Sequence, residues 1–128
     1  MAKTKEELKE IEGIADYYAC NDGTIWSTKI SPRYNPNGDM RLVRPRTHPS
    51  GYLYYGLFVG EGKTKKRLWR RGHRLIYETF VGKIKKGLEI DHIDSDKHNN
   101  TITNLREVTR SENMLAMFER KNKQKKWY

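Results

Sequence analysis

The segment from Glu89 to Asn113 holds the residue types that hydrolytic chemistry requires. Asp91 and His92 are adjacent at the end of an apolar run, and Asn104 follows a loop rich in Asp, Asn and Ser. Carboxylate and amide oxygens suit Mg²⁺ or Mn²⁺. A histidine side chain, whose ordinary pKa is roughly 6.5, can deprotonate water near neutrality. Within a strongly basic chain, this set suggests metal-assisted cleavage of a phosphodiester.

The charge and composition of the chain indicate a polyanionic partner. The 128 residues carry a formal net charge of +10, which favours a polyanion, such as double-stranded DNA or RNA, because Lys and Arg release counterions from phosphates. No apolar run approaches the roughly 20 residues that span a bilayer, so we expect no membrane partner. We also expect no small-molecule substrate. The single Cys20 excludes an internal disulfide and favours a reducing cytoplasm. With 35% hydrophobic and 33% charged residues, the core should be small.

The first 72 residues are predicted to form a basic antiparallel meander. Apolar spacing predicts a short helix over Lys5–Ile11. The turn residues Asn21-Asp22-Gly23 predict a hairpin over Asp16–Ser27. Two prolines, two asparagines and a glycine make residues 31–39 a loop. Further strands are expected at Met40–Pro45, Tyr52–Val59 and Lys66–Arg70.

Residues 73–118 are predicted to form a second unit around the Asp91-His92 pair. The spacing changes to that of a helix over His73–Phe80, which Gly82 ends. Strands over Leu88–Ile93 and Leu105–Val108 flank the polar loop of residues 94–103.

A final helix completes this unit. Thr109 and Glu112 form a possible capping box that opens the helix. Its apolar residues are expected to reach the sheet and join the core; they are Met114, Leu115, Met117 and Phe118. Residues 119–128 should be a basic tail that frays. The predicted fold class is therefore α+β, a β meander with short helices followed by a β-β-α unit.

The pattern of chemical residues resembles the HNH nuclease family, whose catalytic unit is the β-β-α-metal fold. Asp91-His92, Asn104 and Asn113 match its motif position by position. The resemblance implies that His92 is the general base and that Asp91 and Asn113 ligate one Mg²⁺ or Mn²⁺ ion. It also implies that Asn104 braces the loop through hydrogen bonds to backbone. Asn100 is the alternative for the middle asparagine of the motif.

The resemblance extends upstream to the N-terminal module of phage HNH homing endonucleases. The segments that carry it are Ile11–Tyr18, Gly23–Ser27, Ser50–Leu53 and His73–Ile76. It implies sheet-based contacts to the DNA major groove, a phage origin and a place at the nucleoid in the cytoplasm of a bacterial host. A monomer with one site would nick one strand, whereas a double-strand break would need a homodimer or sequential nicks.

Basic residues are concentrated just before the motif. Trp69 is interleaved among them, and no acidic residue occurs between Gly62 and Tyr77. This favours phosphate binding over a merely solvated face. The candidate DNA-binding residues are Lys65, Lys66, Arg67, Arg70, Arg71 and Arg74, together with Arg110 at the start of the last helix.

Other interpretations remain open at this point. A calcium loop beginning at Asp94 lacks the required glycine and glutamate. A zinc site built from His73, His92 and His98 has no cysteine spacing to support it. His73 is more simply a helix cap or a phosphate contact, and a role supporting the site is the alternative. The functional alternatives are a non-catalytic DNA-binding module on a nuclease scaffold and an RNA-binding basic protein.

Overall fold

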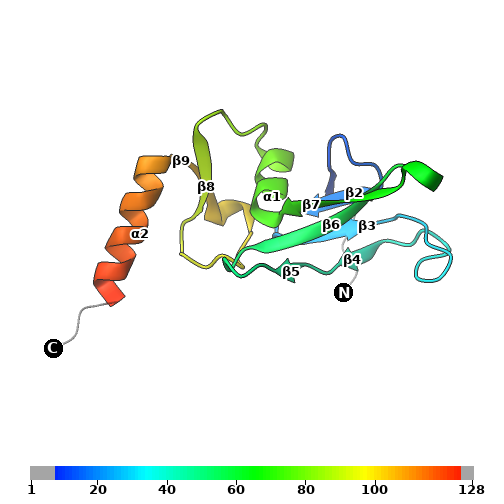
Figure 1. The fold of residues 1–128 in the computed structure, drawn as a ribbon, viewed down its shortest axis with the longest axis horizontal. Helices are drawn as coiled ribbons and strands as arrows, with labels where there is room; N and C mark the ends of the chain where they lie inside the picture. The colour runs from blue at the N-terminus through cyan, green and yellow to red at the C-terminus, as the bar shows by residue number, and fades with distance from the viewer. Residues whose placement is uncertain (1–7, 125–128) are drawn as a thin grey trace.

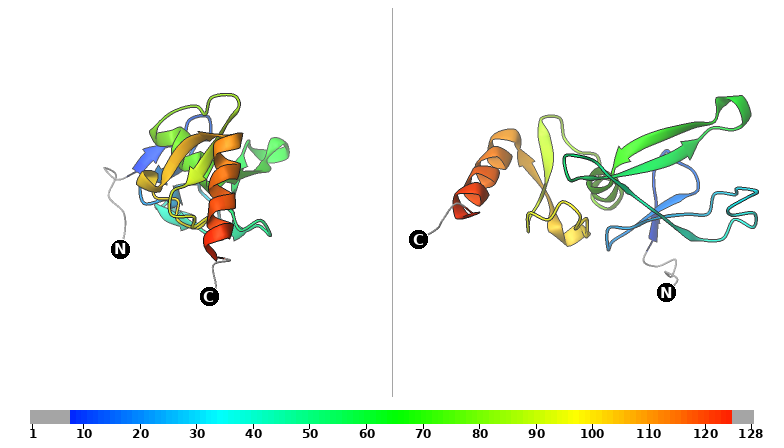
Figure 2. Two further views of the ribbon diagram at one scale, coloured as in Figure 1. Left: turned by 90° about the vertical axis from the view of Figure 1, so that its left-hand side faces the viewer. Right: turned by 60° about the horizontal axis from the view of Figure 1, so that its bottom comes forward.

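The computed structural model describes residues 8–124 and shows an elongated molecule (Figure 1). The sheets of the N-terminal half lie at one end, a β hairpin and the last helix lie at the other, and helix α1 lies between them (Figures 1 and 2). The α+β class is confirmed. The strands are β1 (Leu8–Glu10), β2 (Tyr17–Cys20), β3 (Ile25–Ser27), β4 (Arg41–Val43), β5 (Arg46–Thr47), β6 (Leu53–Val59), β7 (Lys66–Arg71), β8 (Leu88–His92) and β9 (Leu105–Thr109). The helices are α1 (Gly72–Phe80), α2 (Arg110–Gln124) and the 3₁₀ turns η2 (Gly62–Thr64) and η3 (Ile102–Asn104).

The predicted meander is divided into two antiparallel sheets. The first has the order β1-β2-β3-β4 and the second the order β5-β6-β7. The hairpin over residues 16–27 forms as predicted, and Gly23, at φ +93°, donates its N–H to the carbonyl of Cys20. The short strand β5 was not predicted, because its two residues pair only through the neighbouring β6.

The predicted helix over Lys5–Ile11 is wrong where the structure describes it. Leu8–Glu10 is strand β1, which pairs with β2 in the register Leu8↔Cys20. A short apolar stripe has a weak helical preference, and hydrogen bonding to the open edge of β2 overrides it. The rest of that segment lies outside the described residues.

Helix α1 joins the two ends of the molecule. It contacts β1, β2, β6 and β7 on one side and β8 and η3 on the other. Its buried Leu75, Ile76 and Tyr77 belong to a core that also contains Leu57 and Ile90. One continuous core therefore underlies the two segments, residues 1–72 and 73–118, that were predicted as separate units, as far as the structure describes them.

Strands β8 and β9 and helix α2 form the predicted β-β-α unit. The strands pair antiparallel from Leu88↔Thr109 to His92↔Leu105. The capping box is present, since the Thr109 N–H donates to Glu112 and the Glu112 N–H donates to the Thr109 hydroxyl. These hydrogen bonds lower the pKa of the Glu112 carboxyl, with Thr109 as the largest cause.

The apolar residues of α2 are not core residues, contrary to prediction. Met114, Leu115, Met117 and Phe118 are 62%, 63%, 49% and 62% exposed. Figure 1 shows the reason: α2 extends away from the sheets after its first turns. The chain also stays helical to Gln124 instead of ending near residue 118. In the described part of the chain, no helix has the length and apolarity needed to cross a membrane.

The contrast between α1 and α2 predicts opposite responses to truncation. Ile76→Ala removes a side chain that is 0% exposed and should lower the free energy of unfolding by about 2–5 kcal/mol. Leu115→Ala, the matched control on α2, should change it by no more than about 0.5 kcal/mol. Urea unfolding followed by circular dichroism measures both values. Equal losses would place α2 in the core after all.

Candidate functional site

The two faces of strand β8 carry different chemistry. Successive side chains of a strand point to opposite faces. Ile90 belongs to the core, so His92 lies on the core-facing side, whereas Glu89 and Asp91 share the opposite face. Both Asp91 and His92 are nonetheless buried, at 4% and 3% exposure. The adjacent pair can therefore serve two separate tasks.

Asp91 is paired with a cation from the neighbouring strand. Arg106, its register partner on β9, donates from Nε at 3.1 Å and from Nη2 at 2.9 Å to Oδ2 of Asp91. The Arg106 side chain is half exposed, whereas that of Asp91 is nearly buried. A buried carboxylate needs such a counter-charge, and the guanidinium supplies it.

Asn113 lies on the same side as Asp91 but contacts a different residue. Its amide Nδ2 donates to Oε2 of Glu89 at 3.2 Å, and Glu89 precedes Asp91 by two residues on the same face of β8. One carboxylate and one amide oxygen, completed by water and phosphate oxygens, form the donor set that Mg²⁺ uses. The residues present therefore fit a divalent ion on this face of β8.

His92 lies in a buried aromatic cluster. Its Nε2 is 2.8 Å from Oδ1 of Asn100. The ring centroid of His73 lies 5.2 Å from that of His92, and Tyr52 lies 4.9 Å from His73 and 6.0 Å from His92. These contacts come from three elements of the fold and fix the orientation of the imidazole.

His73 is a buried neighbour of His92, so it is neither the helix cap nor the phosphate contact that was preferred for it, and its place matches the alternative prediction of a role supporting the site. It is 4% exposed. Burial, followed by the positive charges of His92, Arg71 and Arg74, lowers its pKa to about 3. Among the described residues, its Nδ1 has no hydrogen-bond partner. His73 therefore stays neutral beside His92 at physiological pH.

Asn104 closes the loop between β8 and β9. Its amide donates to Oδ1 of Asp94 at 2.9 Å and to the carbonyl of Asn99 at 2.8 Å, and its Oδ1 accepts the Asp94 N–H at 3.1 Å. Its backbone carbonyl also accepts the Ile93 N–H. These contacts brace the loop that carries Asn100 next to His92.

The acidic residues of this loop stabilise turns. Asp94 accepts hydrogen bonds from Asn99, from the Asp96 N–H and from Asn104, which lower the pKa of its carboxyl. Asp96 accepts the N–H of His98. Within residues 8–124, no group of three or more His, Cys, Asp or Glu side chains is arranged to hold a metal ion. The structure thus gives no support to the calcium-loop or three-histidine zinc interpretations.

A second surface combines basic and aromatic side chains on one face of β5, β6 and β7. The guanidinium of Arg67 lies 4.7 Å from the Trp69 ring centroid and 5.0 Å from that of Phe58. The register places Phe58 opposite Arg67, and Tyr54 opposite Arg71. We call this the basic-aromatic face; its residues are Arg46, Tyr54, Phe58, Lys65, Arg67, Trp69 and Arg71.

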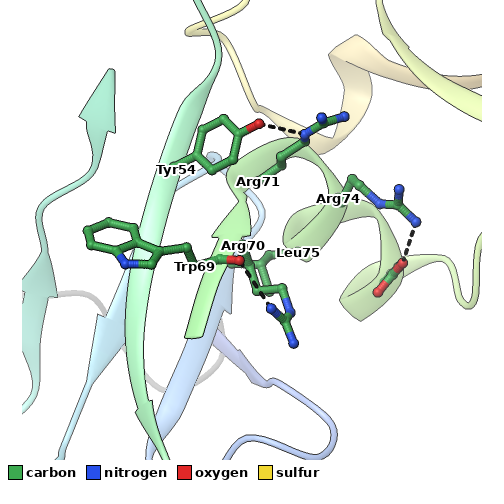
Figure 3. Close-up of a pocket in the computed structure, with 7 residues that line it drawn as sticks. Tyr54, Trp69, Arg70, Arg71, Arg74 and Leu75 are labelled. Carbon is green, nitrogen blue, oxygen red and sulfur yellow. Dashed lines mark hydrogen bonds and ion pairs between the residues drawn. The ribbon is translucent and has the colours of Figure 1, made fainter. Parts of the chain in front are cut away.

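Beside this face, three arginines line an open pocket of about 370 Å³ at the junction of β7 and α1 (Figure 3). Arg71 donates from Nε to the Tyr54 hydroxyl at 2.8 Å. Arg74 forms an ion pair with Glu78 at 3.6 Å. Arg70 completes the trio. Figure 3 shows the three guanidinium groups around the β7–α1 junction, a concentration of positive charge suited to phosphate oxygens.

The structure separates the predicted DNA-binding residues into groups. Lys65, Arg67 and Arg71 lie on or beside the basic-aromatic face. The side chains of Lys66 and Arg70 point to the opposite face of β7. Arg110 lies apart from these, at the first residue of α2, and is exposed.

Sequence reasoning missed two residues of the site. Tyr52 lies in a predicted strand and in the Ser50–Leu53 segment that carries the resemblance, but neither signal pointed to a contact with His92. Arg106 did carry one, because two strands joined by a loop bring residue 106 opposite Asp91 once the register is known. Asn100, weighed only as an alternative middle asparagine, contacts His92 directly.

Comparison with known proteins identifies relatives across most of the chain. Residues 70–115 match the family model for HNH endonucleases. The DNA endonuclease I-HmuI of Bacillus phage SP01 is 34% identical over 116 residues, which are 89% of this chain and 59% of that protein. The uncharacterized HNH endonuclease L245 of Acanthamoeba polyphaga mimivirus is 25% identical over 122 residues, 95% of this chain and 33% of that protein.

A solved structure agrees with the sequence relatives. The chain superposes on the structure of the HNH homing endonuclease I-HmuI, which is described as showing DNA binding and cleavage by that enzyme. The TM-score is 0.71 and the sequence identity is 31%. The match covers 89% of this chain and 59% of that one. The chain therefore spans about three fifths of the length of I-HmuI and one third of that of L245.

The buried, neutral His73 predicts how stability depends on pH. Its pKa is about 3 in the folded chain and roughly 6.5 when unfolded, so below pH 6.5 only the unfolded state gains the proton. The contribution of His73 to the free energy of unfolding is fully present above that pH. It should fall by about 1.4 kcal/mol per pH unit as the pH decreases toward 3.

The matched variant is His73→Phe, which keeps a ring against Tyr52 and His92 but cannot titrate. Urea unfolding of both proteins at pH 7.5 and 5.5 isolates the contribution of His73. We expect the wild type to lose about 1.4 kcal/mol more than the variant between these pH values. An equal loss would show that His73 takes up a proton in the folded state.

Proposed function

This chain belongs to the HNH endonuclease family, and from that premise we propose that it hydrolyses phosphodiester bonds of double-stranded DNA and nicks one strand. The observation that carries the proposal is the arrangement of β8. This strand presents a buried carboxylate on one face and a buried imidazole on the other, at the end of a loop braced by Asn104. A decayed nuclease scaffold would have no need to keep this set.

In this proposal Asp91 and Asn113 hold one Mg²⁺ or Mn²⁺ ion. When bound, the ion neutralises charge on the pentavalent phosphate and stabilises the leaving oxygen. Arg106 neutralises the Asp91 carboxylate in this structure, so the ion would compete with that guanidinium for the carboxylate. Asn113 would turn its amide oxygen from the neighbourhood of Glu89 toward Asp91, a side-chain rotation within the first turns of α2.

His92 activates the water in the proposed reaction. It accepts a proton from a water molecule whose oxygen attacks phosphorus in line with the leaving 3′ oxygen. Cleavage of that bond leaves a 5′-phosphate and, after protonation, a 3′-hydroxyl. Asn104 holds the loop and does not touch the reacting atoms in this scheme, because its hydrogen bonds are used within the loop.

The basic-aromatic face and the arginine pocket bind the DNA in this proposal. Rings stacked on Arg67 restrict its guanidinium before DNA arrives, which reduces the entropy lost on binding. Arg70, Arg71 and Arg74 line the pocket next to α1, the helix that carries His73 beside His92. Lys65 and Lys66 extend the positive charge along β7, and Arg110 would meet phosphate near Asp91.

The cellular setting and oligomeric state are part of the proposal. A nuclease of this kind acts at the nucleoid in the cytoplasm of a phage-infected bacterium. A monomer is sufficient for nicking, because one unit supplies one catalytic set.

Plasmid relaxation tests the catalytic roles. With Mg²⁺ the wild type should convert supercoiled plasmid to open circles, and excess EDTA should stop it. His92→Ala should lower the cleavage rate by about 10²–10⁴-fold while leaving DNA affinity nearly intact, because the base acts in the chemistry and not in binding. His98→Ala, an exposed histidine of the same loop, is the matched control. Unaltered cleavage by His92→Ala would refute the role of His92.

The same gel tests the metal assignment. Asp91→Ala should eliminate the metal-dependent activity. Full activity of the wild type in EDTA would overturn the metal proposal, and absence of cleavage under all conditions would favour a non-catalytic binding module.

The salt dependence of DNA binding tests the arginines. Replacing Arg67, Arg70 and Arg71 by Ala should weaken binding and reduce the slope of log K against log salt by about 0.9 for each lost phosphate contact. The control removes equal charge from the α1–β8 connector, at Lys83, Lys85 and Lys86. Fluorescence anisotropy over a salt series measures both. A slope unchanged by the arginine replacements, or changed equally by the two sets, would place the DNA elsewhere.

A further inference from the structure

Asn100 is the buried polar side chain in direct hydrogen-bond contact with the proposed general base. It is 3% exposed, and its Oδ1 lies 2.8 Å from Nε2 of His92. Among the described residues its Nδ2 has no hydrogen-bond partner. A buried amide N–H without a hydrogen bond lowers the stability of the fold, so its presence calls for a functional explanation. Within the part of the chain that the structure describes, the hydrogen bond of the Asn100 side chain is the one to His92.

The chemistry of that contact assigns the protons of the imidazole. An amide oxygen can only accept a hydrogen bond, so Nε2 of His92 must carry the hydrogen. In the neutral ring the lone pair then resides on Nδ1. With the amide reversed, Nδ2 of Asn100 would donate to Nε2 and the proton would move to Nδ1. The orientation of one amide thus determines which nitrogen can act as a base.

Asn100 is held in place by the N-terminal sheet. A Cβ added to Gly23, in the β2–β3 turn, would lie 2.6 Å from the carbonyl carbon and 2.9 Å from the carbonyl oxygen of Asn100. The Ile102 N–H donates to the carbonyl of Asn21 at 2.9 Å, and the Thr101 hydroxyl donates to that of Asp22 at 3.3 Å. The turn of the first hairpin therefore packs directly against the backbone of residues 100–102.

Two further contacts limit the movement of this loop. A Cβ on Gly72, the first residue of α1, would lie 2.8 Å from Nδ2 of Asn100, so a side chain there would displace the amide. On the other side of the loop, Lys97 donates from Nζ to the carbonyl of Ser50 at 2.6 Å and lies over the Tyr52 ring. The loop is thus anchored to both N-terminal sheets.

From these contacts we infer that Asn100 is a positioning residue for His92. We also infer that the Asn21–Gly23 turn of the first N-terminal sheet holds Asn100 in place. The inference rests on the proposed function. When Nδ1 of His92 takes the proton of the attacking water, the ring becomes an imidazolium whose Nε2–H still donates to Asn100. The amide oxygen stabilises that cation and keeps Nδ1 aimed at the water.

Nitrogen-15 NMR of the 128-residue chain, prepared without metal at pH 8, tests the assignment without any cleavage assay. The wild type should show His92 with hydrogen on Nε2. Asn100→Ala should give a mixture of the two tautomers, and Asn100→Asp, which keeps an acceptor, should retain the Nε2–H form. Hydrogen on Nδ1 in the wild type, or an unchanged spectrum in Asn100→Ala, would overturn the inference even if the protein cleaves DNA.

Cleavage kinetics then separate positioning from folding. Asn100→Ala should lower kcat by about 10²-fold with KM nearly unchanged, since a misplaced base loses rate and not binding. Asn100→Asp should recover part of the rate. The control Asn99→Ala removes a hydrogen bond to Asp94 and one from the Thr101 N–H within the same loop but leaves the His92 contact, and should change kcat by no more than a few-fold. Equal losses in the two alanine variants would overturn the role of Asn100.

A pair of glycine variants tests the contribution of the N-terminal turn. Gly23 and Gly13 both have positive φ, at +93° and +79°, but a Cβ on Gly13 meets nothing within 4 Å. Gly23→Ala should therefore shift the His92 signals and lower kcat by about 10-fold or more, whereas Gly13→Ala, with similar backbone strain, should do neither.

The two measurements keep this inference separate from the proposed function. An inactive wild type with the expected tautomer and the expected response to Gly23→Ala would refute the nuclease activity. It would still support the positioning of His92 by Asn100 and the Asn21–Gly23 turn. An active enzyme whose His92 signals respond alike to Gly23→Ala and Gly13→Ala would refute the role of the turn.

Discussion

The hydrogen bonds of Asn104 are the constraint on which the rest of the site depends. One side chain joins both ends of the β8–β9 loop, accepting the Asp94 N–H and donating to the Asn99 carbonyl. Without that closure, a ten-residue polar loop would have many conformations, and ordering it costs on the order of 1–2 kcal/mol per residue. Because Asn100 immediately follows Asn99, closing the loop also positions the Asn100 amide that contacts His92. Asn104 thus positions Asn100, which in turn contacts the proposed base.

The alternation of β8 then separates charge from proton transfer. Asp91 faces Arg106 on the outer face, where positive charge is favourable. His92 faces Tyr52 and His73 on the inner face, where burial lowers the pKa of His73 to about 3 and keeps that ring neutral. The uncharged stack therefore supports the proposed base, while the counter-charge needed for the carboxylate stays on the other side of the strand.

Local patterns made much of the fold predictable, and long-range contacts explain the remainder. The Asn21-Asp22-Gly23 turn and the Thr109–Glu112 capping box are complete within a few residues, and both formed as predicted. Strand β1 and the exposed apolar face of α2 depend on partners elsewhere: β1 has one in β2, whereas α2 extends away from the sheets. The same limit applies to the site. The motif identified Asp91 and His92, but periodicity does not show that a glycine 77 positions earlier in the chain packs against Asn100.

The arrangement of the arginines follows from the same principle of preorganisation. Gly56 makes the basic-aromatic face possible, because a Cβ there would lie 2.5 Å from Nε of Arg67. With hydrogen at that position, the guanidinium lies between Phe58 and Trp69 and keeps its N–H edges available. A free arginine would lose up to about 2 kcal/mol of rotamer entropy when it contacts a phosphate, and a stacked one has already lost much of it. The β6–β7 ribbon meets α1 at Arg71 and Gly72, and Gly72 packs against Asn100. A surface suited to phosphate is therefore built into the element that also contacts the β8–β9 loop, so rigid contacts connect the proposed DNA-binding surface with the orientation of the proposed base.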